Sequence, residues 1–195
     1  MNEEKGYLCL LLHAHLPFVR HPEHEDFLEE DWFYEALTET YLPILDVLEK
    51  LADEGVDFRL VMSITPPLAN MLSDSLLQNR FKHRLNKLIE FTERECHRLR
   101  NDSTFLPVAQ MYGKKLKRAR YIYSEKYDGN LIHGFKKFQE MGKLEIITCP
   151  ATHGFLPLLL SPKSARAQIR IGIKAVSYTH LRAHETSLHL VCRLL

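Results

Sequence analysis

Three short apolar runs, separated by long helical patterns, constrain the fold of this chain more than any other feature. The runs cover residues 7–12, 58–63 and 144–149, and the second is too continuously apolar for a strand with one face in water. Each run is shorter than an ordinary helix and is followed within a few residues by proline. The order strand, helix, strand, helices, strand, helix predicts parallel strands with right-handed crossovers, and hence an α/β fold.

The first helical pattern follows a polar loop after the first run. Its apolar residues recur at spacings of three and four, at Phe33, Leu37, Tyr41, Leu45, Leu48 and Leu51. Gly55 is a suitable end for this helix. Pro43 predicts a break just before itself, because its ring lacks a donor and crowds the preceding turn.

A large helical insertion follows the second run. Thr65 and the two prolines after it open a helix. Further helical patterns lie at about 77–99, 107–126 and 130–139. Together they exceed the length of a standard crossover.

The last predicted helix gives way to a tail of different character. Ser161 and Pro162 fit the N-cap and first position of an amphipathic helix that runs to about Lys174. Residues 176–195 have no periodicity that continues this helix, and in SYTHLRAHET and LVCRLL they resemble the translated read-through of a sequencing adapter. We therefore expect one native domain, residues 1–175, followed by a non-native tail.

Composition limits the classes of partner. The chain has 195 residues, 45% of them apolar, and a formal net charge of +1, so it can bury the core of one globular domain. The first apolar run is too short to span a bilayer, and acidic residues precede it where a leader would carry positive charge, so we expect a cytoplasmic protein with no membrane partner. The basic run 113–120 has balancing acids nearby and is interpreted as a solvated helix face, so we expect no nucleic-acid partner.

The four cysteines are Cys9, Cys96, Cys149 and Cys192, which lie far apart and form no CxxC pair. We interpret all four as reduced thiols in the core. Cys9 and Cys149 lie in apolar, strand-like runs, which favours this placement.

Histidines follow two of the apolar runs. His13 and His15 come just after the first run, on one face because a strand repeats every two residues, and His153 comes just after the third. Ligands of α/β proteins bind at the carboxyl ends of parallel strands. Three imidazoles there can bind a metal ion, hydrogen-bond a polyhydroxylated substrate, or be buried without function, and the residues themselves leave these alternatives open.

Four separated motifs resemble glycoside hydrolase family 57, and within it most of all the 1,4-α-glucan branching enzymes. The motifs are HAHLPF at 13–18, EEDWFYEA at 29–36, TETYLP at 38–43 and ATHGFLPL at 151–158. They occur in the order expected for the family. The resemblance covers residues 1 to about 175.

The resemblance implies the N-terminal part of an incomplete (β/α)7 TIM-like barrel with parallel strands and a large helical insertion. It implies a retaining double displacement on an α-1,4-glucan or maltooligosaccharide, with no metal and no cofactor. His13, His15 and His153 would line the subsite next to the scissile bond, and Trp32 would stack on a glucose ring. The family's nucleophilic glutamate and its acid/base aspartate have no counterpart in this sequence, so we expect no catalytic residue and no activity in this chain alone.

Several functions remain to be distinguished. The leading hypothesis is part of a glycogen branching transferase, with amylase-type hydrolysis as a close variant. The second is a metal-dependent hydrolase of the amidohydrolase type, in which His13 and His15 bind a divalent ion. The third is a non-catalytic piece that binds carbohydrate or has a structural role. An open sheet of three parallel strands also predicts poor solubility, because its apolar edge is uncovered.

Overall fold

Two compact units make up the chain in the computed structural model, which describes residue 6, residues 8–179 and residue 181. The sheet unit comprises the described residues up to Phe18, residues 51–70 and those from Phe135 onward. The hairpin unit comprises residues 19–50 and 71–134. Cys192 and most of the predicted tail lie outside the described residues.

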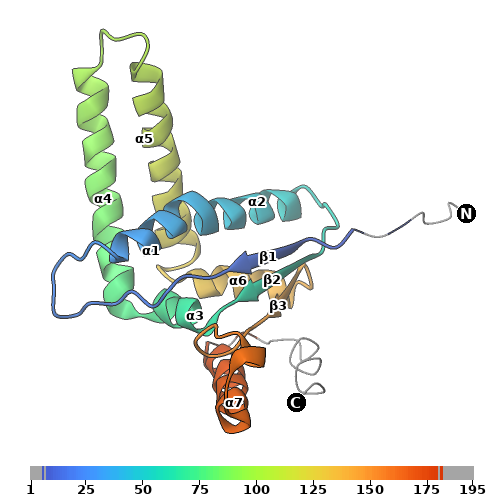
Figure 1. Ribbon diagram of the computed structural model, residues 1–195. Helices are drawn as coiled ribbons and strands as arrows, with labels where there is room; N and C mark the ends of the chain where they lie inside the picture. The colour runs from blue at the N-terminus through green and yellow to red at the C-terminus, as the bar shows by residue number, and fades with distance from the viewer. Residues whose placement is uncertain (1–5, 7, 180, 182–195) are drawn as a thin grey trace, which may run out of the picture. The chain divides into compact units, whose positions relative to one another are not determined.

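Three parallel strands form the centre of the sheet unit (Figure 1). They are β1 (Leu11–Ala14), β2 (Leu60–Ile64) and β3 (Leu144–Ile147), in the order β1-β2-β3. Met62 of β2 pairs with Leu12 on one side and Ile146 on the other, and it is buried. The parallel α/β arrangement predicted from the order of the elements is confirmed.

The first strand begins later than the apolar run predicts. It starts at Leu11, because its partner β2 starts only at Leu60 and the register pairs Leu11 with Val61. Leu8 and Leu10, inside the predicted run, are exposed. In consequence His13 lies within the strand and not past its end, while His15 is the residue just after it.

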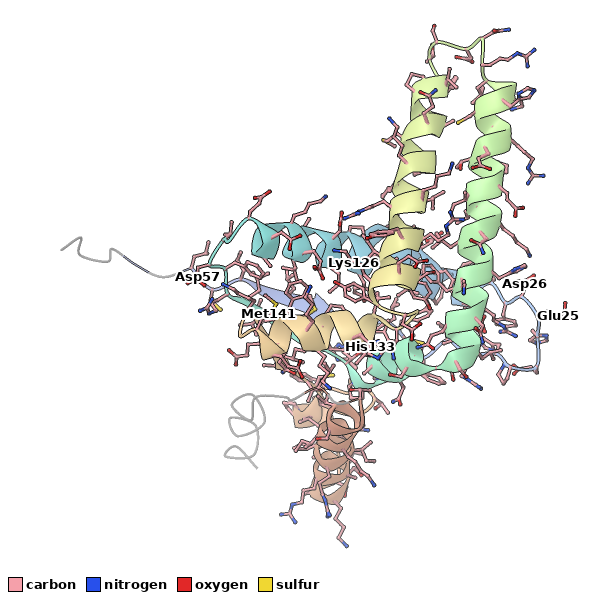
Figure 2. The ribbon with its side chains drawn as sticks, turned by 180° about the vertical axis from the view of Figure 1, so that it is seen from behind. Glu25, Asp26, Asp57, Lys126, His133 and Met141 are labelled. Carbon is pink, nitrogen blue, oxygen red and sulfur yellow. The ribbon has the colours of Figure 1, made fainter. Side chains whose placement is uncertain are left out.

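An ion pair and a backbone hydrogen bond join the amino ends of β2 and β3. The Lys143 ammonium lies 2.5 Å from the Asp57 carboxylate, and the Leu60 N–H donates to the Lys143 carbonyl at 3.1 Å. Figure 2 labels Asp57, which precedes β2, and Met141, in the turn before β3. This end of the sheet is therefore closed by an ion pair, and the opposite end carries the histidines.

A last helix, α7 (Pro162–Tyr178), belongs to the sheet unit. Its Ala165 and Ile169 form a small core with Leu156, at the start of the short 3-10 helix η3 (Leu156–Leu158). Ser161 occupies the N-cap position, as predicted, but its side chain makes no capping hydrogen bond. The helix also continues past its predicted end near residue 174, and Val176, assigned to the tail, is fully buried.

The hairpin unit begins with an interrupted helix. α1 (Glu30–Ala36) is followed by the π-helical segment η1 (Leu37–Tyr41) and by α2 (Leu42–Asp53). The break predicted just before Pro43 is confirmed, and it takes the form of a wider turn that accommodates the missing donor. Gly55, with φ of +74°, follows the end of α2 as expected.

Two long helices form the hairpin that names the second unit (Figure 1). The elements of the insertion are α3 (Pro66–Ser73), α4 (Ser75–Arg98), α5 (Leu106–Tyr121), the π-helical η2 (Ile122–Lys126) and α6 (Leu131–Glu140). Asp74 caps α4 by accepting a hydrogen bond from the Leu77 N–H at 3.0 Å. The large helical insertion predicted from the sequence is confirmed.

Two further predictions concern the thiols and the membrane. Cys9, Cys96 and Cys149 form no disulfide, as expected, but Cys9 is exposed and the other two are half-buried, so their placement in the core is wrong. Cys9 lies ahead of β1, and Leu8 and Leu10 on either side of it are exposed as well. Within the described part of the chain, helices that could cross a bilayer are absent.

Candidate functional site

Three imidazoles meet at the carboxyl end of the sheet. The ring centroids of His13 and His15 are 6.0 Å apart, those of His13 and His153 are 5.0 Å apart, and those of His15 and His153 are 4.0 Å apart. His13 and His15 come from β1 and the residue after it, and His153 comes from the loop after β3. The sequence prediction that these residues converge is confirmed.

His15 is held in place from the end of β2. Its Nδ1 shares a hydrogen bond with the Thr65 hydroxyl at 3.1 Å, and Thr65 is fully buried. The Thr65 N–H donates to the Ala14 carbonyl at 3.1 Å, so side chain and backbone of one residue join the two strand ends. The Thr148 hydroxyl joins β3 to β2 in the same way, by donating to the Ile64 carbonyl at 3.1 Å.

The charge state of His15 follows from this crowding. Burial lowers the pKa of His15 below its ordinary value, and the positive forms of His153 and His13 lower it further. The ring is therefore neutral at pH 7. A neutral imidazole offers one donor and one acceptor, which suits the hydroxyl groups of a sugar.

His153 stands on an unusual backbone. Its φ is +58°, a left-handed conformation that residues other than glycine rarely adopt. Its Nδ1 lies 3.3 Å from the Cys149 sulfur, and that thiol donates to the Pro150 carbonyl at 3.3 Å. Burial raises the pKa of Cys149 to about 11, so the group is a thiol. Because its proton points to Pro150, we assign the Nδ1 proton to His153, which leaves Nε2 as an acceptor.

The arrangement of the rings does not suit a shared metal ion. An ion bound by several imidazoles lies close to the plane of each ring. The rings of His15 and His153 are instead stacked, with 29° between their planes. Among the described residues, no group of three or more histidine, cysteine or acidic side chains is arranged to hold a metal.

Trp32, the predicted sugar platform, belongs to the hairpin unit. It lies on α1 and is 51% exposed, so its ring is open to a ligand. The residues just before it anchor the helix to α4: Glu30 pairs with Arg80 at 2.7 Å, and Asp31 pairs with Arg84 at 2.7 Å. The structure thus brings three of the four predicted binding residues together in one unit and places the fourth, Trp32, in the other.

A buried carboxylate organises the loop before Trp32. Glu30 is 1% exposed and accepts hydrogen bonds from the Tyr34 hydroxyl at 2.7 Å, the His21 N–H at 3.0 Å and Arg80. Burial by itself would raise the pKa of Glu30, but these bonds and the Arg80 charge hold it below the ordinary value. Arg80 also donates to the carbonyls of His21 and His24, so one ion pair fixes the loop.

A hollow of about 750 Å³ in the hairpin unit contains none of the predicted site residues. It lies between η1, α4 and α5 and has a mainly apolar lining that includes Tyr34, Leu88, Phe91, Tyr112 and Leu116. We do not take this hollow as the functional site, because its described walls hold no cluster of imidazoles like the one at the strand ends.

Sequence reasoning missed the residues that hold the site. Thr65 and Thr148 follow strands directly, and that position is the one signal that could have identified them. Cys149 was assigned to the core and instead contacts His153. Gln168, which bonds to the loop of His153, lies in the following helix, and no sequence pattern indicates that it contacts this loop.

Comparisons with known proteins match this chain to one family of enzymes. The model for glycosyl hydrolase family 57 matches residues 9–180. A curated 1,4-alpha-glucan branching enzyme of Thermococcus kodakarensis is 36% identical over 169 residues, which is 87% of this chain and 24% of that enzyme. The chain thus spans about a quarter of the length of this relative.

Solved structures agree with this match. The alpha-amylase AmyC of Thermotoga maritima is 44% identical with a TM-score of 0.83, over 88% of this chain and 32% of that one. A branching enzyme of this family from Pyrococcus horikoshii is 35% identical with a TM-score of 0.83, over 92% of this chain and 34% of that one. The likeness confirms the predicted fold class, the N-terminal part of an incomplete (β/α)7 barrel.

Proposed function

Because the chain belongs to glycosyl hydrolase family 57, we propose that it forms the substrate-binding part of an enzyme acting on α-1,4-glucans, most simply a branching transferase. The observation that carries the proposal is the stacking of His13, His15 and His153 at the carboxyl end of the sheet. A glucan with adjacent hydroxyl groups can use the donor and acceptor nitrogens of such a cluster.

Each proposed binding residue has a separate role. The Nε2 of His153, left as an acceptor by the contact with Cys149, accepts a hydrogen bond from a sugar hydroxyl. His15, neutral and oriented by Thr65, bonds a neighbouring hydroxyl, and His13 completes the row. Trp32 stacks on the apolar face of a glucose ring.

The proposed chemistry needs two further groups. A retaining double displacement uses two carboxyl groups about 5 to 5.5 Å apart, one as nucleophile and one as acid/base. The proposal assigns neither role to an acid of this chain, so residues 1–175 bind substrate without turning it over. Removal of a covalent nucleophile lowers kcat by several powers of ten.

Hydrolysis of the amylase type is the second candidate. The likeness to an alpha-amylase supports it, and the curated relative supports branching. A transferase and a hydrolase of one family share the binding residues and the nucleophile, and they differ in whether water or a sugar hydroxyl is the acceptor. The proposal therefore concerns the binding of the glucan, and it does not depend on whether water or a sugar hydroxyl is the acceptor.

Calorimetric titration with maltohexaose tests the proposal. The 195-residue chain should release heat with maltohexaose and none with cellohexaose, whose β-1,4 links present the hydroxyls differently. His15→Ala should lower the affinity by about tenfold, the loss expected for one hydrogen-bonding group. Lys163→Ala, on the exposed start of α7, is the matched control and should bind like wild type. A folded chain that gives no heat with maltohexaose overturns the proposal.

The metal-dependent alternative has its own test. Elemental analysis of protein prepared with added Zn²⁺ and then dialysed should find no stoichiometric metal. Zinc retained at one ion per chain, and lost in His13→Ala, would favour the amidohydrolase hypothesis over the glucan proposal.

A further inference from the structure

The turn that carries His153 adopts a conformation that its sequence does not favour. The turn comprises residues 149–154, and at His153 its φ of +58° crowds the Cβ atom against the backbone. The His153 N–H donates to the Pro150 carbonyl at 2.9 Å, which closes the turn but does not relieve that crowding. A conformation of this kind persists only where surrounding contacts impose it.

One residue of α7 supplies several of those contacts. The Gln168 side-chain oxygen accepts a hydrogen bond from the Thr152 N–H at 2.9 Å, and its amide nitrogen donates to the Thr152 hydroxyl at 2.9 Å. The Ala151 N–H donates to the Gln168 carbonyl at 3.0 Å. Side chain and backbone of Gln168 therefore bind the two residues just before His153.

A glycine one helical turn later lets α7 approach this closely. A Cβ atom on Gly172 would lie 2.5 Å from the Cys149 carbonyl oxygen and 3.6 Å from the Ala151 nitrogen. The nearest atoms belong to backbone, which cannot rotate away as a side chain can. Gly172 therefore sets the distance between the helix and the start of the turn.

Direct contacts join the turn to the imidazole of His153. Cys149, at the start of the turn, contacts the His153 Nδ1 through its sulfur, and the His153 ring stacks on His15. A shift of the turn would separate the rings of His153 and His15. The small core formed by Leu156, Ala165 and Ile169 holds η3 against the same helix, so the contacts of Gln168 and Gly172 add to an existing packing surface.

We propose that Gln168 and Gly172 are positioning residues, which hold the turn of residues 149–154 so that the His153 imidazole stacks on His15 and faces the glucan. The inference rests on the proposed function for its purpose, but its geometry can be tested without a sugar. Both residues act through His153 and touch no substrate.

The first test follows the titration of His15 by NMR of the imidazole C–H groups in the 195-residue chain. His153→Asn should raise the pKa of His15 in the wild-type background, because one neighbouring imidazole is lost. In Gln168→Leu the pKa of His15 should already be raised, and adding His153→Asn should change it no further. An unchanged His15 titration in Gln168→Leu, still sensitive to His153→Asn, overturns the proposal.

The second test uses a pair of helical glycines. Gly172→Ala should shift the imidazole signals of His153 and lower maltohexaose affinity by about tenfold, the loss of one hydrogen-bonding group. Gly113→Ala in α5, where a Cβ would meet the Thr92 side chain at 3.5 Å or more, is the matched control and should leave both unchanged. Equal imidazole spectra for Gly172→Ala and wild type contradict the role of Gly172.

Conservative replacement separates positioning from general stability. Gln168→Glu keeps an acceptor for the Thr152 N–H and a partner for its hydroxyl, so the imidazole spectrum measured at pH 8 should resemble wild type while that of Gln168→Leu does not. A spectrum of Gln168→Glu as disturbed as that of Gln168→Leu counts against the proposal. Absence of maltohexaose binding by wild type would overturn the proposed function, and the His15 titration would still decide the positioning role.

Discussion

The imidazole rings of His15 and His153 stack with their centroids 4.0 Å apart, although they come from opposite edges of the three-stranded sheet. Two imidazolium ions at this distance repel each other, and His13 adds a third ring within 6.0 Å of His15. Burial and the two neighbouring rings therefore hold the pKa of His15 below its ordinary value. In its neutral form this ring keeps one donor and one acceptor for hydroxyl groups, and protonation in acid removes the acceptor.

Acid should destabilise the fold through His15. Its pKa in the folded chain lies below the ordinary value of 6.5, so the unfolded chain binds a proton that the folded chain does not. This contribution to the free energy of unfolding is present above pH 6.5 and decreases as the pH falls below it. Thermal unfolding between pH 8 and pH 5 should show a smaller loss of stability in His15→Gln than in wild type. If stability falls equally with pH in wild type and in His15→Gln, His15 is not the group responsible.

The buried pair of Glu30 and Arg80 should dominate the stability of the hairpin unit. Arg80→Leu leaves a carboxylate that is 1% exposed without its countercharge, and it should lower the free energy of unfolding by about 3 to 5 kcal/mol. Urea denaturation measures this loss. The double variant Glu30→Leu with Arg80→Leu should recover much of it, because no unpaired charge remains.

An exposed pair provides the control for that experiment. Arg98 and Glu95 lie 2.6 Å apart on the surface of α4, where water screens both charges. Arg98→Leu should change the urea midpoint far less than Arg80→Leu. Equal shifts of the urea midpoint in Arg80→Leu and Arg98→Leu would show that the burial of Glu30 does not determine the loss of stability.

Gly134 in α6 should not tolerate alanine, in contrast to most helical glycines. Its Cβ would lie 2.9 Å from both Leu45 and Tyr127, and neither can move, because Leu45 is fully buried and the Tyr127 hydroxyl donates to Glu49 at 2.6 Å. Gly134→Ala should therefore cost about 1 to 3 kcal/mol by overpacking.

Gly113 is the matched position for this replacement. A Cβ there meets ordinary contacts only, so Gly113→Ala should be neutral or stabilise α5 by up to about 1 kcal/mol through helix propensity. Thermal melting of the two variants measures both effects. A Gly134→Ala protein that melts at or above the wild-type temperature would show that α6 can shift to make room.

The sequence predicts the features that depend on local pattern. The period of a strand places His13 and His15 on one side, and the parallel order of the elements brings His153 to the same end. Pro43 marks the break between α1 and α2 because its missing donor acts within one turn. The resemblance of four motifs then supplies the fold class, which likeness to solved structures confirms.

Features that depend on contacts distant in sequence could not be predicted in this way. The left-handed backbone of His153 follows Thr152, which is bonded to Gln168 of the following helix. The late start of β1 depends on where β2 begins, and the exposure of Cys9 follows from it. Ser161 has the right residue type for a cap, yet its hydroxyl makes no such bond.

Trp32 offers a direct measurement of sugar binding, because it is the one tryptophan of the chain and its ring is 51% exposed. If a glucose ring stacks on it as proposed, maltohexaose should move its fluorescence emission to shorter wavelength and protect it from quenching by acrylamide. Trp32→Ala should lower maltohexaose affinity by about tenfold, the scale of a lost ring contact of roughly 1.4 kcal/mol. Trp32→Phe keeps an aromatic face and should bind within a few-fold of wild type.

Comparison of wild type with His15→Ala tests whether the emission of Trp32 depends on His15. Anchoring of α1 by Glu30 and Asp31 holds Trp32 regardless of ligand, so its emission without sugar should not change in His15→Ala. With saturating maltohexaose, His15→Ala should keep the blue shift, because the shift reports stacking of a glucose ring on Trp32 itself. An emission that maltohexaose leaves unchanged in both proteins would contradict the proposed role of Trp32.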